Sequence, residues 1–180
     1  MKFKTGDTVI YPHHGAACIE EISEKNFRGK KRMYLKLRIL NGDLVIQVPE
    51  DSLAEVGVRE VSNDEELERV FDVLREEDVE EPSNWSRRYK ANGEKLTSGD
   101  VNKVAEVVRD LTRRDHDRGL SAGEKRMLTQ AREILGSEVA LARGLDGDEA
   151  DILLDEIMGF APAEESAESP ESAESAESAE

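Results

Sequence analysis

Residues 33–48 read MYLKLRILNGDLVIQV: apolar and polar side chains alternate over residues 33–39, and a turn signal separates them from a mostly apolar run at residues 44–48. Alternation with a period of two is typical of a strand that has one buried face and one face in water. Asn41 and Gly42 both tolerate the positive φ angles of a type I′ turn. The stretch therefore predicts a tight β-hairpin with strands at residues 33–39 and 44–48.

Two more strands are predicted upstream of this hairpin. Residues 8–11 are mostly apolar and end at Pro12, and a second apolar-polar stretch covers residues 16–24. Several short strands in fewer than about 60 residues favour a small, strongly bent sheet or barrel. We expect this β domain to occupy residues 1–61.

Helical periodicity replaces the strand pattern from residue 62 onward. Apolar side chains recur at spacings of three and four in successive segments, of which the last, residues 152–158, is short. Gly119 is expected to end the helix that contains residues 101–111. Helix starts are expected at polar residues that can cap a helix: Ser62 with Glu65 in capping-box spacing, Ser83 or Asn84, Ser98 or Asp100, and Ser121 with Glu124.

The distribution of charge along the 180 residues is more informative than the net charge of −16. Residues 1–49 and residues 82–145 each carry a net charge of +4, whereas residues 50–81 carry −11. An acidic stretch between two mildly basic blocks is expected where two domains of different composition are joined.

These patterns predict an α+β chain with two domains. After the β domain we expect a helix and acidic linker over residues 62–81 and an all-α helical domain over residues 82–160. Residues 161–180 repeat Ser-Ala-Glu and contain no large apolar side chain, so they cannot offset the entropy of ordering. They are predicted to form a disordered acidic tail.

Composition and missing motifs exclude several classes of protein. Apolar runs are short and no export signal is visible, so we expect no membrane segment. The single cysteine, Cys18, fits a reducing cytoplasm. The chain lacks the phosphate-loop, dinucleotide-binding, nucleophile-elbow and zinc-protease motifs. We therefore expect no enzymatic activity, no cofactor and no small-molecule substrate.

Two groups of residues offer chemistry, and each has a more ordinary interpretation. His13, His14 and Cys18 are the nearest approach to a metal cluster, but adjacent histidines on a strand or turn point in different directions. The carboxylates of residues 64–81 could supply an acid–base pair, although a solvated charge run is the commoner reason for such composition. We assign neither group a metal-binding or catalytic role.

The informative group is the segment 84–90, which reads NWSRRYK. It holds the only tryptophan, Trp85, beside three cations, and such Arg and Lys side chains can neutralise DNA phosphates. An aromatic ring among them can wedge between bases. Tyr89, at i+4 from Trp85, fits an apolar seam against the next helix, whereas Trp85 is equally compatible with an exposed role and with packing.

Four stretches closely resemble the CarD family of bacterial transcription regulators in its actinobacterial form. They lie in order within about residues 1–158, and the repetitive tail lies outside them. The stretches read FKTGDTVIYPHHG (3–15), EPSNWSRRYK (81–90), SGDVNKVAEVVRDL (98–111) and GLSAGEKRML (119–128).

The resemblance implies a Tudor-like N-terminal barrel, similar to the polymerase-interacting domain of the transcription-repair coupling factor. In that family the barrel binds the RNA polymerase β subunit, and the helical domain contacts promoter DNA at the upstream edge of the transcription bubble. The implied function is a cytoplasmic, nucleoid-associated regulator that stabilises the open complex formed by the polymerase holoenzyme, for example at ribosomal RNA promoters.

Residue roles follow from the same resemblance. Trp85 corresponds to the tryptophan that wedges into the minor groove. The cations that would hold the DNA backbone are Lys90 and Lys125, with Arg87, Arg88 and Arg114 as weaker candidates.

The sequence departs from the family pattern where polymerase contact is implied. Lys25 and Gln47 occupy positions that are commonly Arg in the resembling proteins. Lys keeps the charge without the bidentate fork and Gln loses the charge, so a weaker or rearranged contact is expected. Gly93 is also unusual for its position and is expected to soften the helix that carries Trp85.

Two alternatives to polymerase-bound regulation remain open on the sequence alone. A polymerase-independent architectural DNA-binding protein would use Trp85 as its wedge and would bind duplex DNA tightly at low salt. A Tudor-type reader of methylated protein tails would need an aromatic cage around a cation. The aromatic residues available for a cage in the β domain have spacings that do not favour one: Phe3, Tyr11, Phe27 and Tyr34.

Overall fold

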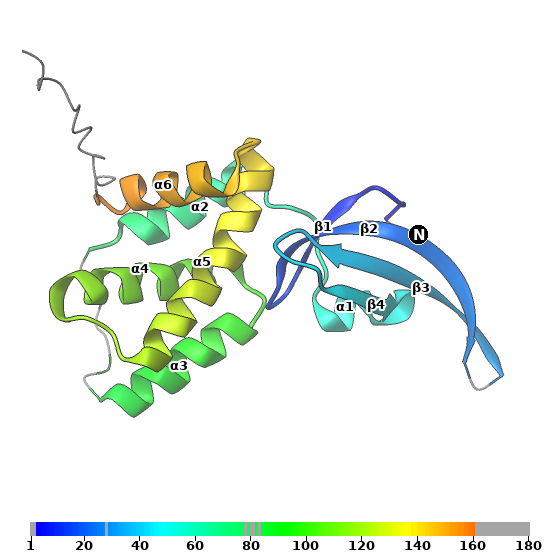
Figure 1. Cartoon of the computed structure of the whole chain (residues 1–180), viewed down its shortest axis with the longest axis horizontal. Helices are drawn as coiled ribbons and strands as arrows, with labels where there is room; N and C mark the ends of the chain where they lie inside the picture. Colours follow the sequence, from blue (N-terminus) through cyan, green and yellow to red (C-terminus); the bar gives the residue numbers. More distant parts are fainter. Residues whose placement is uncertain (1–2, 28, 78, 80–81, 83, 161–180) are drawn as a thin grey trace, which may run out of the picture.

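The computed structural model describes residues 3–160 except residues 28, 78, 80–81 and 83. Four strands come first and the long helices follow (Figure 1). We call residues 3–61 the β part and residues 62–160 the helical part. The β part contains β1 (Thr8–Tyr11), β2 (Gly15–Phe27), β3 (Lys30–Ile39) and β4 (Val45–Pro49), then a 3-10 turn η1 (Glu50–Ser52) and a short helix α1 (Leu53–Val56).

The helical part has its own hydrophobic core, built by the apolar faces of its helices. A second core lies between the sheet and α1. The predicted α+β order, strands before helices, is confirmed. The disorder predicted for residues 161–180 lies outside the described residues. The helices are α2 (Asp64–Arg75), α3 (Trp85–Thr97), α4 (Val101–Arg118), α5 (Ala122–Arg143) and α6 (Gly147–Ile157).

The four strands form one antiparallel sheet in the order β1-β2-β3-β4. Leu35 and Leu37 of β3 face Val48 and Ile46 of β4 across the sheet, so the alternation of the sequence becomes one buried face. The long strands β2 and β3 curve strongly (Figure 1), and their register shifts at a bulge between Ile19 and Glu21. A bulge increases local twist and helps a sheet to bend.

The sheet is open, and the predicted barrel is not confirmed. Among the described strands, β1 and β4 lie at opposite edges and do not pair. The free edge of β1 is met by the chain after α1: Ile10 N donates to Arg59 O at 2.8 Å, and Arg59 N donates to Ile10 O at 3.1 Å. After β4 the chain turns into η1 and α1, and among the described residues only this single bridge continues the sheet.

The turn between β3 and β4 differs from the prediction. Asn41 does not have a positive φ, so Asn41-Gly42 is not a type I′ turn, although Gly42 has φ 134°. Ile39 N donates to Leu44 O at 2.9 Å, which leaves a longer connection between the strands. The Asn41 side chain donates instead to Glu133 O of α5 at 3.4 Å, a contact that the local sequence does not reveal.

Helix capping agrees with the sequence at three predicted starts. Asn84, Asp100 and Ser121 cap α3, α4 and α5, and Ser121 forms a capping box with Glu124. α3 runs through Gly93 without interruption. None of the described helices is long and apolar enough to cross a membrane.

The first predicted cap is wrong by one residue. Asn63 caps α2 and forms the capping box with Glu66, whereas Ser62 and Glu65 were expected. Ser62 is buried, and its N–H and hydroxyl both donate to Glu138 of α5. A buried carboxylate needs hydrogen-bond donors, so Ser62 donates to Glu138 and does not cap the helix.

The β part and the helical part touch through the start of β2 and the middle of α5. Ala16 N donates to Ser137 Oγ at 3.1 Å. Gly15 has φ 78°, and a Cβ built there would lie 2.3 Å from Ser137 Oγ. Glycine is therefore required at position 15 for both its backbone angle and its close approach to α5.

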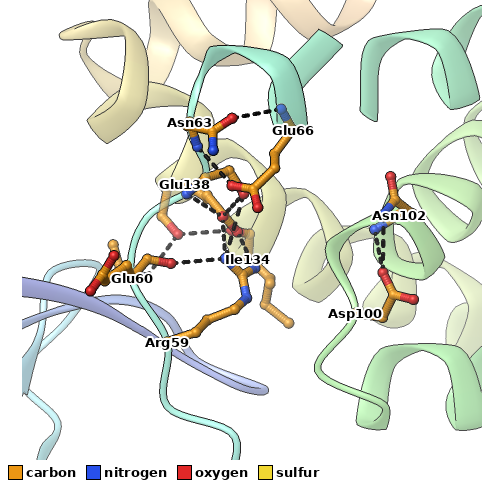
Figure 2. A network of polar contacts seen from close by, with 11 residues as sticks. Arg59, Glu60, Asn63, Glu66, Asp100, Asn102, Ile134 and Glu138 are labelled. Carbon is orange, nitrogen blue, oxygen red and sulfur yellow. Dashed lines mark hydrogen bonds and ion pairs between the residues drawn. The ribbon is translucent and has the colours of Figure 1, made fainter. Parts of the chain in front are cut away.

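A buried ionic cluster strengthens this contact (Figure 2), and we call Arg59, Ser62 and Glu138 the Glu138 cluster. Arg59 Nη1 and Nη2 donate to the two carboxylate oxygens of Glu138 at 2.6 and 2.7 Å. The Glu138 side chain is 1% exposed and that of Arg59 is 32% exposed. Arg59 also belongs to the bridge with β1, so the cluster joins the sheet directly to α5.

Candidate nucleic-acid interface and sheet face

Trp85 is the first residue of α3, and its side chain is 51% exposed. The helix begins there because Asn84 Oδ1 accepts hydrogen bonds from Ser86 N at 2.9 Å and Arg87 N at 3.2 Å. The sequence is compatible with an exposed Trp85 and with a packed one, and in the structure about half of the residue is exposed.

The indole of Trp85 is exposed but held in place from two sides. Its Nε1 donates to Ser121 Oγ, the cap of α5, at 3.3 Å. Its ring stacks on Tyr89 with centroids 5.4 Å apart and an angle of 24° between planes. Tyr89, expected in an apolar seam, is 38% exposed and packs closely against Gly123 of α5. A large apolar surface is therefore presented to solvent in one orientation.

Arg88 does not fit its predicted role as a DNA contact. It is 3% exposed, and its Nε and Nη2 both donate to Glu124 Oε1, at 3.1 and 2.8 Å. Its Nη1 donates to Pro82 O at 3.2 Å. Arg88 shares the buried side of α3 with Asn92 and Leu96. Their spacing of four residues is the sequence signal that could have identified Arg88 as buried, in contrast to Arg87.

Glu124 lies at the centre of the site and was recognised from the sequence only as part of a capping box. Besides Arg88, it accepts from Ser121 Oγ at 2.8 Å and lies 3.9 Å from Arg114 Nε. Burial raises the pKa of Glu124, but hydrogen bonds from Arg88 and Ser121 outweigh burial and hold the pKa below its ordinary value of 4.5. The ionised Glu124 thus connects α3, α4 and the start of α5.

Three of the predicted DNA contacts are exposed cations around Trp85. Arg87 and Lys125 form no ion pair with another described residue. Lys90 lies 3.8 Å from Glu94 with both side chains largely in water, a pair that contributes little. The N-termini of α3 and α5 meet here as well, and their dipoles favour anions. We call Trp85, Arg87, Lys90, Ser121 and Lys125 the Trp85 face; Arg114 lies behind it, half-buried.

We expect Glu124→Gln to lower the free energy of unfolding at pH 7 by about 3 kcal/mol, because the buried guanidinium of Arg88 loses its compensating charge. The variant should also be less sensitive to acid. A carboxylate with a lowered native pKa stabilises the fold above its unfolded-state pKa, and this contribution is lost as pH falls through the native pKa. Urea unfolding between about pH 7 and pH 3 measures both effects.

Glu94→Gln is the matched control, since it removes an exposed carboxylate from α3. It should change stability by less than about 0.5 kcal/mol. Equal losses in the two variants would contradict the role given to the buried pair.

The two residues predicted to bind polymerase lie side by side on the exposed face of the sheet. Lys25 of β2 and Gln47 of β4 are 22 residues apart, and Lys25 Nζ donates to Gln47 Oε1 at 2.6 Å. Lys25 Nζ also lies 5.8 Å from the ring centre of Tyr34, on the strand between them. The structure therefore brings together two positions that the sequence separates.

Further charged residues extend this surface along β3. Arg38 Nε donates to Glu20, and Lys36 Nζ lies 2.9 Å from Glu20 Oε2. Hydrogen bonds from Lys36 and Arg38 lower the pKa of Glu20. We call the exposed Lys25, Arg38 and Gln47 together with the half-buried Tyr34 and Lys36 the sheet face.

The histidine pair lies in the turn between β1 and β2. Within the described residues, no group of three or more His, Cys, Asp and Glu side chains is placed to hold a metal ion. His13 has φ 72° in the turn between β1 and β2, and Cys18 is a half-buried free thiol.

Comparison with known proteins gives two matching family models. Residues 3–62 match the CarD-like/TRCF RID domain, and residues 69–155 match the C-terminal domain of CarD. A Bacillus subtilis protein named "Putative transcription factor YdeB" is 34% identical over 143 residues, which cover 79% of this chain and 94% of that protein.

Proposed function

The chain belongs to the CarD family of transcription factors, and from this premise we propose that it binds the RNA polymerase β subunit and stabilises the promoter open complex. The sheet face contacts the polymerase, and the Trp85 face contacts promoter DNA at the upstream edge of the bubble. Trp85 inserts into the minor groove there. The open, bent sheet serves as a variant of a Tudor-like barrel.

The exposed and oriented Trp85 is the observation that carries this proposal. A half-exposed tryptophan is unfavourable in water, and here hydrogen bonding to Ser121 and stacking on Tyr89 keep it at the surface. Apolar side chains inserted between base steps unstack them at a cost of a few kcal/mol per step, and neighbouring cations hold the backbone. This cost is smallest at the edge of a bubble, where stacking is already interrupted.

Polymerase binding compensates for weak DNA affinity. The net charge is −16, and the Trp85 face offers only a few cations, so counterion release on duplex DNA is small. A protein tethered to polymerase meets the promoter at high effective concentration and needs little affinity of its own. A wedge at the upstream fork then opposes collapse of the bubble without melting DNA by itself.

The test is the lifetime of open complexes after a competitor challenge, measured with the cognate holoenzyme on a ribosomal RNA promoter. We expect the protein to prolong the lifetime and to bind short duplex DNA weakly in the absence of polymerase. An unchanged lifetime together with tight duplex binding would contradict the proposal and favour the architectural alternative.

We expect Lys25→Glu to weaken binding to the isolated β subunit about tenfold, because a reversed charge in an interface repels the surface it was matched to. Lys103→Glu, on the exposed side of α4, makes the same change in net charge outside the sheet face. Titration of the labelled β subunit without DNA measures both. Equal weakening by the two variants would mean that only net charge matters.

A further inference from the structure

Residues 161–180, which we call the acidic tail, carry seven Glu and no Lys, Arg or His. The last described residue, Phe160, fixes where this segment leaves the fold. Its ring stacks on His116 of α4 with centroids 4.1 Å apart, and its N–H donates to Asp155 O at 2.8 Å. The acidic tail therefore starts beside the last turn of α4.

The opposite side of α4 faces the Trp85 face, so the helix itself separates that surface from Phe160 (Figure 1). Arg114, two residues before His116, is 3.9 Å from Glu124, and Glu124 accepts from Ser121, which holds Trp85. One helix, α4, thus lies between the origin of the acidic tail and the proposed DNA-binding surface.

Charge determines which neighbouring surface suits the acidic tail. Residues 146–160, at α6, carry six Asp or Glu and no Lys or Arg, so they repel it. The Trp85 face and its surroundings attract it instead. The exposed cations on α3, on α5 and at the end of α4 that pair with no other described residue are Arg87, Lys125, Arg126 and Arg118.

The acidic tail is long enough to reach these cations. Twenty residues span at most about 66 Å when extended, which is several times the diameter of one helix. Attachment of two groups to one chain over a short span gives an effective concentration in the millimolar range. A weak, multivalent contact between glutamates and cations is then populated within one molecule.

We propose that the acidic tail docks on the Trp85 face and competes with DNA phosphates for its cations. This inference rests on the proposed function, because it gives the docked surface a DNA-binding role. Random duplex DNA must displace the acidic tail, whereas a promoter presented by polymerase displaces it readily. The acidic tail thereby favours polymerase-bound promoters over free DNA.

The first experiment compares DNA affinity at two salt concentrations. A tail variant should bind a short duplex about three- to tenfold more tightly than the original chain at about 50 mM salt, and equally at about 500 mM. The control removes the same charge from exposed carboxylates elsewhere and should not change the affinity as much. The tail variant is Glu165→Gln, Glu168→Gln, Glu171→Gln and Glu174→Gln; the control is Glu21→Gln, Glu55→Gln, Glu65→Gln and Glu156→Gln.

The second experiment detects docking without DNA. A spin label at Ser172→Cys, in a Cys18→Ser background, should broaden the amide signals around Lys125 and Arg87 at low salt but not at high salt. Broadening confined to α2 and α6, or spread evenly over the fold, would overturn the proposal.

The outcomes separate the acidic tail from the DNA-binding role. If the tail variant and the control bind DNA with equal affinity, competition by the acidic tail is wrong while DNA binding stands. If no variant binds DNA, with or without polymerase, the DNA-binding role is wrong. Broadening at Lys125 and Arg87 would then support docking alone, and its absence would overturn that too.

Discussion

Trp85→Ala is expected to shorten the lifetime of open complexes about tenfold relative to the original protein, while binding to the polymerase β subunit stays unchanged. Loss of an aromatic side chain that stacks on a base weakens binding by about 1–3 kcal/mol, and 1.4 kcal/mol corresponds to a factor of ten. The sheet face lies on the other part of the molecule, so the polymerase contact that we propose for it should not be altered. Competitor-challenged transcription measures the lifetime, and titration of the β subunit measures the affinity of the protein for polymerase.

The fold should tolerate this substitution. Trp85 is half exposed, and Asn84 caps α3 through the backbone N–H groups of Ser86 and Arg87, which the substitution does not change. Ile152→Ala is the matched control: Ile152 is a large apolar residue on α6 with 45% exposure, outside the Trp85 face. It should leave the lifetime unchanged.

Trp85→Phe should have an intermediate effect on the open-complex lifetime. Phenylalanine keeps an aromatic ring but cannot donate to Ser121, so the lifetime should fall between those of the original protein and Trp85→Ala. A Trp85→Ala protein that prolongs the lifetime as well as the original would rule out the wedge and leave the cations as the only contact.

The strands and most helix ends could be predicted because their signals are local. In β3 the alternating residues Leu35, Leu37 and Ile39 are buried, as their period of two requires. Asn84, Asp100 and Ser121 cap helices through N–H groups two or three residues ahead. Neither kind of signal depends on the rest of the chain.

The errors occur where a distant residue competes with the local pattern. Ser62 would satisfy a helix end, but Glu138, 76 residues away, takes its hydroxyl. Asn41 suits a tight turn, but its side chain reaches Glu133 O on α5. These partners are determined by how the β part meets the helical part, which no short window of sequence contains.

The candidate site could likewise be predicted only where its signals are local. The composition of residues 84–90 indicated a basic, aromatic surface, and Trp85, Arg87 and Lys90 are exposed there. That Trp85 would be exposed could not be predicted, because it is held by Ser121, 36 residues further on. Lys25 and Gln47 came from family resemblance alone, and their hydrogen bond needs β3 folded between them.

Glu138→Ala is expected to lower the free energy of unfolding by about 3 kcal/mol and to separate the unfolding of the two parts. Glu138 accepts hydrogen bonds from Arg59 and Ser62, and its loss leaves the buried Ser62 N–H without a partner. Arg59 is about one third exposed and can still reach water, which keeps the loss below the upper end of such changes.

Separate unfolding follows from the two hydrophobic cores. They share no residue, and the strands and helices communicate mainly through β2, Arg59 and α5. With the Glu138 cluster intact, urea unfolding should give one transition followed alike by Trp85 fluorescence and far-ultraviolet circular dichroism. In Glu138→Ala the two probes should diverge, because Trp85 reports on the helical part alone.

Two further variants make this test specific. Glu133→Ala removes an exposed carboxylate from the same helix and should leave a single transition. Gly15→Ala keeps the Glu138 cluster but places a Cβ 2.3 Å from Ser137 Oγ at a φ of 78°, so it should separate the parts by a different route. Glu138→Ala and Gly15→Ala should also shorten open-complex lifetimes, because a loosely connected helical part no longer presents Trp85 at a fixed position relative to polymerase. Normal open-complex lifetimes together with separated unfolding transitions would contradict this. They would show that binding to polymerase is enough and that a fixed position of the helical part is not needed.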